Sequence, residues 1–262
     1  MISVVRAEWT KLRTVASTAW LLFAAVATTI AIGAAVTSAT TTRDCPTPST
    51  CFEDLTKLSL TGVQYGQAAV VVLAVLVMTD EYGTRSISVT LTAVPRRWKV
   101  FASKAAVVTG AVLVIAALSV LGSLLVGRLV LPGNGFGVAN GYRPLSLGDE
   151  PTLRAAYGSV LYLALVALLS LGVATVLRDT AGSITVMLML LYTSPVLTAF
   201  VTDPRWLKRL EKFSPMSAGL KIQATIGLDK LAIGPWAGLG VLAAWAGGAL
   251  ALGMLALRYR DA

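Results

Sequence analysis

The stretch AAVVTGAVLVIAALSVLGSLLVG, residues 105–127, decides the fold because it runs for 23 residues without a charged side chain. A helix rises about 1.5 Å per residue and needs about 20 apolar residues to cross the hydrocarbon core of a bilayer. Backbone N–H and C=O groups in that core must be hydrogen-bonded within the protein, so a single segment crosses as a helix. Residues 105–127 are therefore expected to span a membrane.

Five further stretches of 22 residues or more also lack charge, and they lie at 14–42, 58–79, 155–177, 180–202 and 231–257. Charged residues make up 13% of the chain, about half the share that is usual in a soluble domain. The first stretch is too long for a signal peptide and is expected to be retained. The sequence predicts an all-α membrane protein. It is expected to form a single domain, residues 1–262, with six transmembrane helices at about 18–40, 59–79, 104–128, 155–177, 182–202 and 235–257.

The residue types that the chain lacks narrow its chemistry. It has no histidine, which excludes the usual histidine-based metal sites and Ser–His or Cys–His catalysis. It contains no Gly-x-x-x-x-Gly-Lys-Ser/Thr loop for ATP phosphates, and no charged residue lies near the centre of an expected span. We therefore expect no catalytic residue, no metal site, no cofactor bound by this chain and no ion-driven pump.

The charge of the chain favours lipid as a partner. The net charge is +9, but lysine and arginine lie at the ends of the expected spans rather than in one basic stripe. Such a distribution suits anionic lipid headgroups better than nucleic acid. We expect membrane lipids, and no nucleic acid, among the partners.

The orientation follows from early charges and from cysteine. Lysine and arginine divide equally, 11 to 11, between the two sides, but Arg6, Lys11 and Arg13 precede the first span, where charge weighs most. The only two cysteines, Cys45 and Cys51, share one short loop and either form a disulfide or remain free thiols. The disulfide is favoured and would place that loop in an oxidising compartment. Both termini are then expected in the cytoplasm.

Two segments are expected at the cytoplasmic surface. Ile2, Val5, Trp9 and Leu12 recur at helical spacing before the first span, which predicts an interfacial amphipathic helix or a charged leader that orients that span. Between the second and third spans a second apolar stripe appears, formed by Ile87, Leu91, Val94, Trp98 and Phe101. Pro95 should divide this segment into a short helix at about 84–93 and a second helix that enters the third span. The short helix is either a lipid-facing connector or a docking element.

The order of residues in that segment resembles the first cytoplasmic loop of ABC-2-type transporter permeases. In that family an acidic residue, Gly-Thr, an apolar run, a proline, an arginine and a lysine follow one another, as Glu81, Gly83, Thr84, Pro95, Arg97 and Lys104 do here. The amphipathic leader, the six spans and the long loop before the last span are also similar. The resemblance therefore covers essentially the whole chain.

The resemblance implies a division of labour. The permease would form the pathway, and a separate ABC ATPase subunit would bind ATP and Mg²⁺ and drive it. Two ATPase copies and two permease copies, expected as a homodimer, would make up the exporter in a bacterial plasma membrane. The cytoplasmic loop would be a coupling helix, with the following residues in contact with the ATPase or at the flank of that contact: Glu81, Gly83, Thr84, Arg85, Arg96 and Arg97.

Polar and sulfur-containing residues within the spans are candidates for the translocation pathway. Gln64, Tyr65 and Gln67 either line an outer gate or lie at the headgroup level of the second span. In the fifth span Met187, Met189 and Tyr192 either present an adaptable surface to an apolar substrate or serve ordinary packing. Pro195 is expected to kink that span.

Two further features concern packing and the outer surface. The Gly62-x-x-x-Gly66 pair is read either as a dimer or gate contact or as packing within one subunit. The loop at 202–235 is expected to hold short re-entrant or surface helices.

The function expected from all these features is a permease subunit of an ABC exporter for a hydrophobic or amphiphilic substrate. One alternative is a membrane anchor or immunity protein that binds a partner without transport. Another is a membrane-embedded enzyme, which is disfavoured because the chain lacks histidine and a buried acid pair.

Overall fold

The computed structural model describes residues 2–42, 53–83, 97–142 and 144–260, and all regular structure in those ranges is helical, without strands. The long helices are α1 (Ile2–Thr14), α2 (Ala16–Ala39), α4 (Val63–Gly83), α6 (Arg97–Val130), α7 (Glu150–Leu177), α8 (Thr180–Phe200) and α11 (Pro235–Arg260). The short ones are α3 (Leu55–Ser59), η2 (Leu131–Asn134), η3 (Val138–Asn140), α9 (Pro204–Phe213), α10 (Pro215–Gly219), η4 (Leu220–Gln223) and η5 (Leu228–Lys230).

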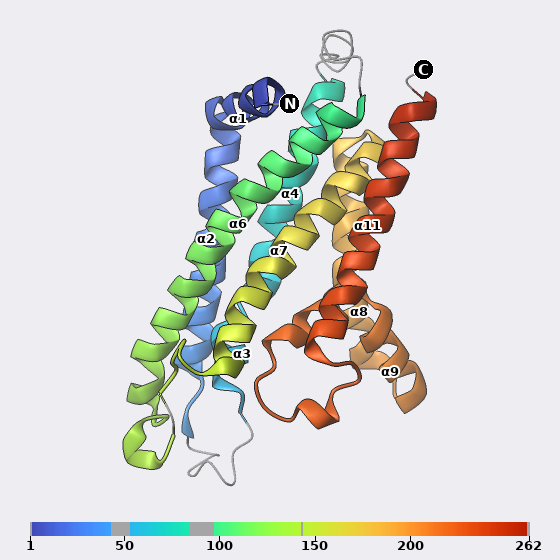
Figure 1. Cartoon of the computed structure of the whole chain (residues 1–262). Coiled ribbons are helices and arrows are strands. Elements are labelled where there is room, and N and C mark those ends of the chain that lie inside the picture. The colour runs from blue at the N-terminus through green and yellow to red at the C-terminus, as the bar shows by residue number, and fades with distance from the viewer. Residues whose placement is uncertain (1, 43–52, 84–96, 143, 261–262) are drawn as a thin grey trace.

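Six of these helices, α2, α4, α6, α7, α8 and α11, are long and apolar enough to cross a membrane. This confirms the prediction of an all-α protein with six membrane spans. Helix α1, the end of α4, the start of α6 and the end of α11 lie together at one end of the bundle, here called the terminal end (Figure 1). Helices α3 and α9 and the 3-10 turns lie at the opposite end, here called the loop end (Figure 1).

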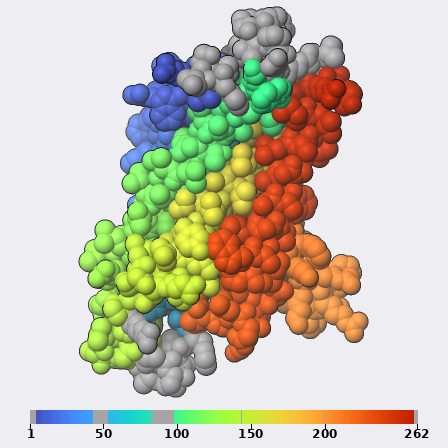
Figure 2. All heavy atoms as spheres, in the orientation of Figure 1, coloured from blue at the N-terminus to red at the C-terminus, as the bar shows by residue number. Residues whose placement is uncertain are grey.

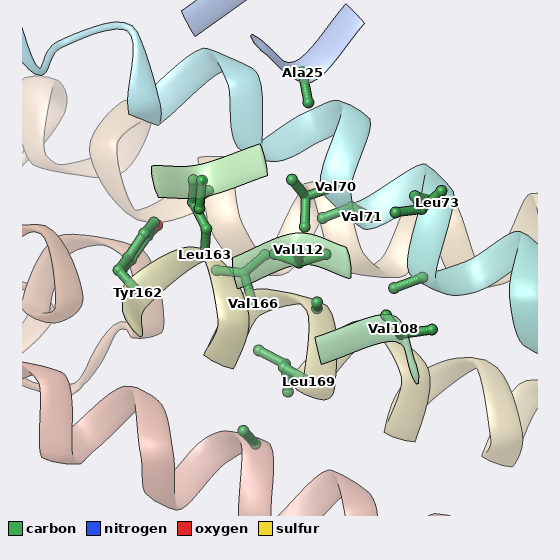
Figure 3. Packing of buried hydrophobic residues seen from close by; sticks show 14 of the residues in the cluster. Ala25, Val70, Val71, Leu73, Val108, Val112, Tyr162, Leu163, Val166 and Leu169 are labelled. Atoms are coloured by element: carbon green, nitrogen blue, oxygen red, sulfur yellow. The ribbon is translucent and has the colours of Figure 1, made fainter. Parts of the chain in front are cut away.

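Three central helices form the hydrophobic core. Helix α7 contacts α4, α6, α8 and α11, while α2 packs against α4 and α6 on the other flank. Figure 3 shows the buried side chains of Val71, Val112 and Val166 on three different helices pointing toward one another. Figure 2 shows α6, α7 and α11 side by side across one face, without a gap between them. Helices α2, α8 and α11 are less buried and form the periphery of the bundle.

Three spans have boundaries that differ from the sequence expectation. The fourth span begins at Glu150 rather than at about 155. The second span begins at Val63 rather than at about 59, because Leu55–Ser59 forms the separate helix α3, capped at its start by the Asp54 carboxylate. The third span is one continuous helix, Arg97–Val130, of 34 residues or about 51 Å in length. Since the hydrocarbon core is about 30 Å thick, α6 must extend beyond it or tilt, and Figure 1 shows it lying obliquely.

The Gly62 and Gly66 pair packs within the subunit. A Cβ atom at Gly62 would overlap the backbone carbonyl of Thr29 in α2, and one at Gly66 would overlap the Thr29 hydroxyl. The two glycines therefore let α2 approach the start of α4. This is the intrasubunit reading of the motif rather than the dimer contact.

The loop before the last span divides into an outer and an inner part. Helix α9 has no buried residue, and its apolar and cationic side chains occupy different faces. Helix α10 and η4 instead bury Met216, Ala218 and Ile222 against α7 and α11. The expected short helices are present. Helix α9 lies on the surface, while α10 and η4 pack into the bundle. Helix α8 continues through Pro195 and ends at Phe200.

Candidate functional site

The predicted coupling residues fall at the terminal end where the structure describes them. Gly83 is the last residue of α4 and Arg97 is the first residue of α6, so the predicted loop connects these two helix ends. Glu81 lies in the last turn of α4. Thr84, Arg85 and Arg96 lie outside the described residues, as does the predicted short helix at 84–93.

A buried ion pair lies next to these helix ends. The Lys104 ammonium in α6 is 2.8 Å from a carboxylate oxygen of Glu8 in α1, and the side chains are only 2% and 5% exposed. The same ammonium donates to the Val77 carbonyl of α4 at 3.4 Å. Burying a charge is costly unless it is paired and hydrogen-bonded, and both conditions hold for Lys104. One side chain therefore joins α1, α4 and α6.

An apolar contact positions α1 beside this ion pair. Leu12 is buried against Val107 and Ala111 of α6, and Val5 and Val77 pack around the same cluster. Trp9 remains half-exposed on the same helix. The predicted amphipathic helix therefore exists, but its apolar face rests on α6 rather than only on lipid. Glu8 turns toward the bundle between these apolar contacts.

A cavity of about 450 Å³ opens beside the ion pair. Its walls come from α1, α2, α4, α6 and the start of α8, and its polar lining includes Glu8, Lys11, Thr18, Asp80 and Lys104. Two carboxylates and two ammonium groups thus line one cavity among the ends of five helices, together with apolar side chains such as Leu73 and Leu76. The cavity leaves free space beside the ion pair, unlike the closely packed core around Val71, Val112 and Val166.

The end of α4 is also connected to the far side of the bundle. Thr180 at the start of α8 donates to the Thr79 hydroxyl at 2.8 Å. Arg178, between α7 and α8, lies with its guanidinium 5.1 Å from the centre of the Tyr82 ring and donates to the Ala256 carbonyl of α11. Arg178 has a positive φ of 60°, a conformation that costs free energy in a non-glycine residue. These contacts connect the end of α4 to α8 and, through Arg178, to α11.

A second polar cluster lies inside the bundle nearer the loop end. Gln67 is fully buried; its amide nitrogen donates to the Gln64 carbonyl at 2.9 Å, and its amide oxygen accepts from the Tyr162 hydroxyl at 2.5 Å. The Tyr192 hydroxyl donates to the same Gln64 carbonyl at 2.6 Å. The Met216 sulfur of α10 lies 3.2 Å from the Gln67 amide nitrogen. The cluster thus connects α4, α7, α8 and α10.

The predicted pathway residues do not share one surface. Gln64, Gln67 and Tyr192 meet in the cluster just described, and Met187 is fully buried nearby on α8. Tyr65 and Met189 are exposed on the outside of the bundle. In this conformation Gln67 and Met187 therefore serve packing, and a pathway through them requires the helices to separate. Their role in transport stays a prediction.

The sequence reasoning missed the Glu8–Lys104 pair. The sequence placed the cations at the span ends, and Lys104 served there as the lysine that completes the family-like order of residues beginning at Glu81. The sequence does contain a sign of this pair. Glu8 lies beside the apolar face that Val5, Trp9 and Leu12 form on the leader helix. An acid at that position of an interfacial helix requires a cation from a neighbouring segment. Cys45 and Cys51 lie outside the described residues, so the disulfide stays a prediction.

Comparison with known proteins assigns no family. No protein-family model matches the chain, and no curated protein matches it. The structure gives a multi-pass membrane protein with six spans.

Proposed function

We propose that this chain is the membrane subunit of an ABC exporter, a permease of the ABC-2 type. A separate ATPase subunit binds ATP and Mg²⁺, and two copies of each chain form the working assembly. The terminal end faces the cytoplasm of a bacterial cell. The observation that carries the proposal is the buried Lys104 ammonium, which joins α1 and α4 to α6 at the end from which the predicted coupling segment departs.

The geometry suits a mechanism driven from outside the membrane. Gly83 and Arg97 bracket the predicted coupling segment, so a force on that segment acts on α4 and α6 together. Glu8 passes the same force to α1, while Thr79 and Tyr82 pass it to α8 and to Arg178. The cavity among these helix ends provides space for the ends of α1, α4 and α6 to move. Switching between two packed arrangements of helices is an established route for such coupling.

The substrate is proposed to be hydrophobic or amphiphilic. The spans carry no charge near their centres that would bind an ion, and the interior polar groups of the Gln67 cluster are neutral. A pathway would open where α4 and α8 part, beside the hydrogen bond from the Tyr192 hydroxyl to the Gln64 carbonyl.

The test is co-expression with the cognate ATPase subunit that the proposal requires. We expect a stable complex that hydrolyses ATP, while the purified chain alone does not. Losing a desolvated charged contact costs about 2–5 kcal/mol of binding, so Glu81→Ala and Arg85→Ala should reduce complex yield or transport at equal expression. Lys208→Ala, at the exposed loop end, is the control and should match wild type.

Two results would contradict the proposal. ATP hydrolysis by the isolated chain would show that a separate ATPase subunit is not needed. If Glu81→Ala and Arg85→Ala both kept wild-type complex yield and transport, the predicted coupling segment would not bind the ATPase. A partner that binds but carries no ATP site would instead favour a membrane anchor without transport.

A further inference from the structure

A continuous apolar groove runs along the outside of the bundle between α8 and α11. Its part near the loop end has a volume of about 760 Å³ and lies between α8, α9 and α11. A second part, of about 520 Å³, continues between α7, α8 and α11. The two parts share Val186, Leu190 and Trp245, so they form one groove rather than two separate hollows.

The groove contains one charged residue, at the loop end. Arg209 of α9 lines it beside Trp206, Leu210 and Phe213, and its guanidinium lies 5.3 Å from the centre of the Trp206 ring. Everything beyond α9 that lines the groove is uncharged. The groove is therefore cationic at its mouth, at the end of the bundle, and apolar along its length.

The rest of α9 adds positive charge at the same mouth. Arg205, Lys208 and Lys212 are exposed on this helix together with Arg209. Its one acidic residue, Glu211, is bound to Lys221 at 3.2 Å and so is already neutralised. Figure 1 shows α9 projecting sideways at the lower right, beyond α8 and α11, where it would meet a lipid headgroup layer.

The groove is a fixed part of the structure. The Trp245 indole nitrogen of α11 donates to the Phe213 carbonyl at the end of α9 at 3.0 Å, which holds the corner between these helices. The Asp203 carboxylate accepts from the Arg205 backbone nitrogen at 2.8 Å and caps the start of α9. On α8 the lining from Leu197 to Val186 covers about 16 Å of helix, enough to lie along much of one acyl chain.

We propose that this groove binds one anionic phospholipid. The phosphate lies at Arg209, where a guanidinium offers paired donors, and one acyl chain follows α8 and α11 past Trp245. Charge complementarity favours this occupant, because an apolar protein surface of a second copy would leave Arg209 buried without an anion. The site is independent of the proposed transport function and of which face of the membrane the loop end occupies.

Two glycines on α11 give a matched test of the apolar part. Gly248 lines the groove, Gly247 precedes it on the same helix but does not, and an added Cβ meets no atom within 4 Å at either. Gly248→Leu should therefore fill the groove without disturbing the fold. Gly247→Leu adds the same side chain to the helix and leaves the groove open.

The measurement is native mass spectrometry of the purified chain titrated with dioleoyl-phosphatidylglycerol. We expect one tightly bound lipid, with at least fivefold weaker binding of dioleoyl-phosphatidylcholine. Gly248→Leu and Arg209→Gln should each weaken binding at least tenfold. Gly247→Leu should bind as wild type does. Lys208→Gln, on the same helix but away from the groove, should have a smaller effect that disappears in 0.5 M salt, where the screening length is about 4 Å.

Three outcomes would overturn the proposal. Equal loss in Arg209→Gln and Lys208→Gln would mean that α9 only attracts an anionic surface. Equal behaviour of the two glycine variants would mean that no acyl chain enters the groove. A dimer that Gly248→Leu disrupts, without lipid, would assign the groove to a second copy of the chain. Size-exclusion and melting profiles establish that each variant is folded, and Arg209→Gln keeps the test valid if Gly248→Leu is not.

Discussion

A carboxylate secures each end of the bundle, but the two are held differently. At the loop end, Asp54 accepts four hydrogen bonds, from the backbone nitrogens of Lys57, Thr225 and Ile226 and from the Thr225 hydroxyl. At the terminal end, Glu8 is held by the ammonium groups of Lys104 and, more loosely, Lys11. Hydrogen bonds from fixed backbone groups specify one position, whereas an ammonium group on a flexible stem can follow a moving partner.

The structure around Asp54 also differs from the structure around Glu8. The loop end is further fixed by Arg154, which donates to the Ala224 carbonyl at 2.6 Å, and by the contact of Gly62 with the Thr29 backbone. At the terminal end a cavity of about 450 Å³ opens beside the ion pair, and a cavity of about 380 Å³ also lies beside Asp54 at the loop end. Under the proposed permease function, the terminal end, where ammonium groups hold the carboxylate, is the end expected to rearrange.

The largest effect is expected from Glu8→Ala. It leaves the buried Lys104 ammonium without its carboxylate, and removing one partner of a buried ion pair costs about 3–5 kcal/mol of stability. Thermal unfolding followed by tryptophan fluorescence measures the loss. Lys11→Ala is the control: its side chain is 50% exposed and its pair with Glu8 is 3.5 Å long, so the effect should stay below about 1 kcal/mol.

The double variant Glu8→Leu, Lys104→Met sharpens this prediction. Replacing a buried ion pair with apolar side chains of similar size is often neutral or stabilising. We therefore expect a melting temperature near wild type, together with weakened coupling between ATP hydrolysis and transport. Full activity in the double variant would show that the pair serves folding alone.

A smaller effect is expected from Asp54→Ala, about 2–3 kcal/mol. The variant leaves the Thr225 and Ile226 backbone nitrogens at the loop end without their acceptor, and bonds to a charged group are worth more than neutral ones. Limited proteolysis within residues 220–234 measures the release of this loop. Glu53→Ala, one residue earlier and exposed, should leave the digestion pattern unchanged. Equal digestion in both variants would refute the anchoring role of Asp54.

A comparable effect, about 1–3 kcal/mol, is expected from Gly62→Ala, because the added Cβ would overlap the Thr29 backbone carbonyl. Gly110→Ala in α6 is the matched control, because a Cβ there meets no atom within 4 Å and alanine favours a helix. Unfolding of the monomer in detergent distinguishes the two. If Gly62→Ala abolished the dimer but left the stability of the monomer unchanged, Gly62 would instead lie in a contact between subunits.

The sequence predicted the elements better than their contacts. Absence of charge over 22 residues or more is a strong signal, so all six spans were found. The break at Leu60–Gly62 was missed because no charge or proline marks it, and the close approach of Thr29 to Gly62 is visible only in the structure. Glu8 and Lys104 are 96 residues apart, and a pairing at that separation follows from packing rather than from periodicity. The Gln67–Tyr162 bond was missed for the same reason.

The central claim is that an ATP-binding subunit docks at the terminal end. Two exposed tryptophans provide a direct test: Trp98 at the start of α6, 49% exposed, and Trp206 of α9 at the loop end, 57% exposed. Each is replaced by a photo-crosslinking benzoylphenylalanine, and membranes of the native host are irradiated. We predict that position 98, and not position 206, crosslinks to a polypeptide that also binds azido-ATP. A crosslink to such a polypeptide at position 206, or none at position 98, would contradict the account.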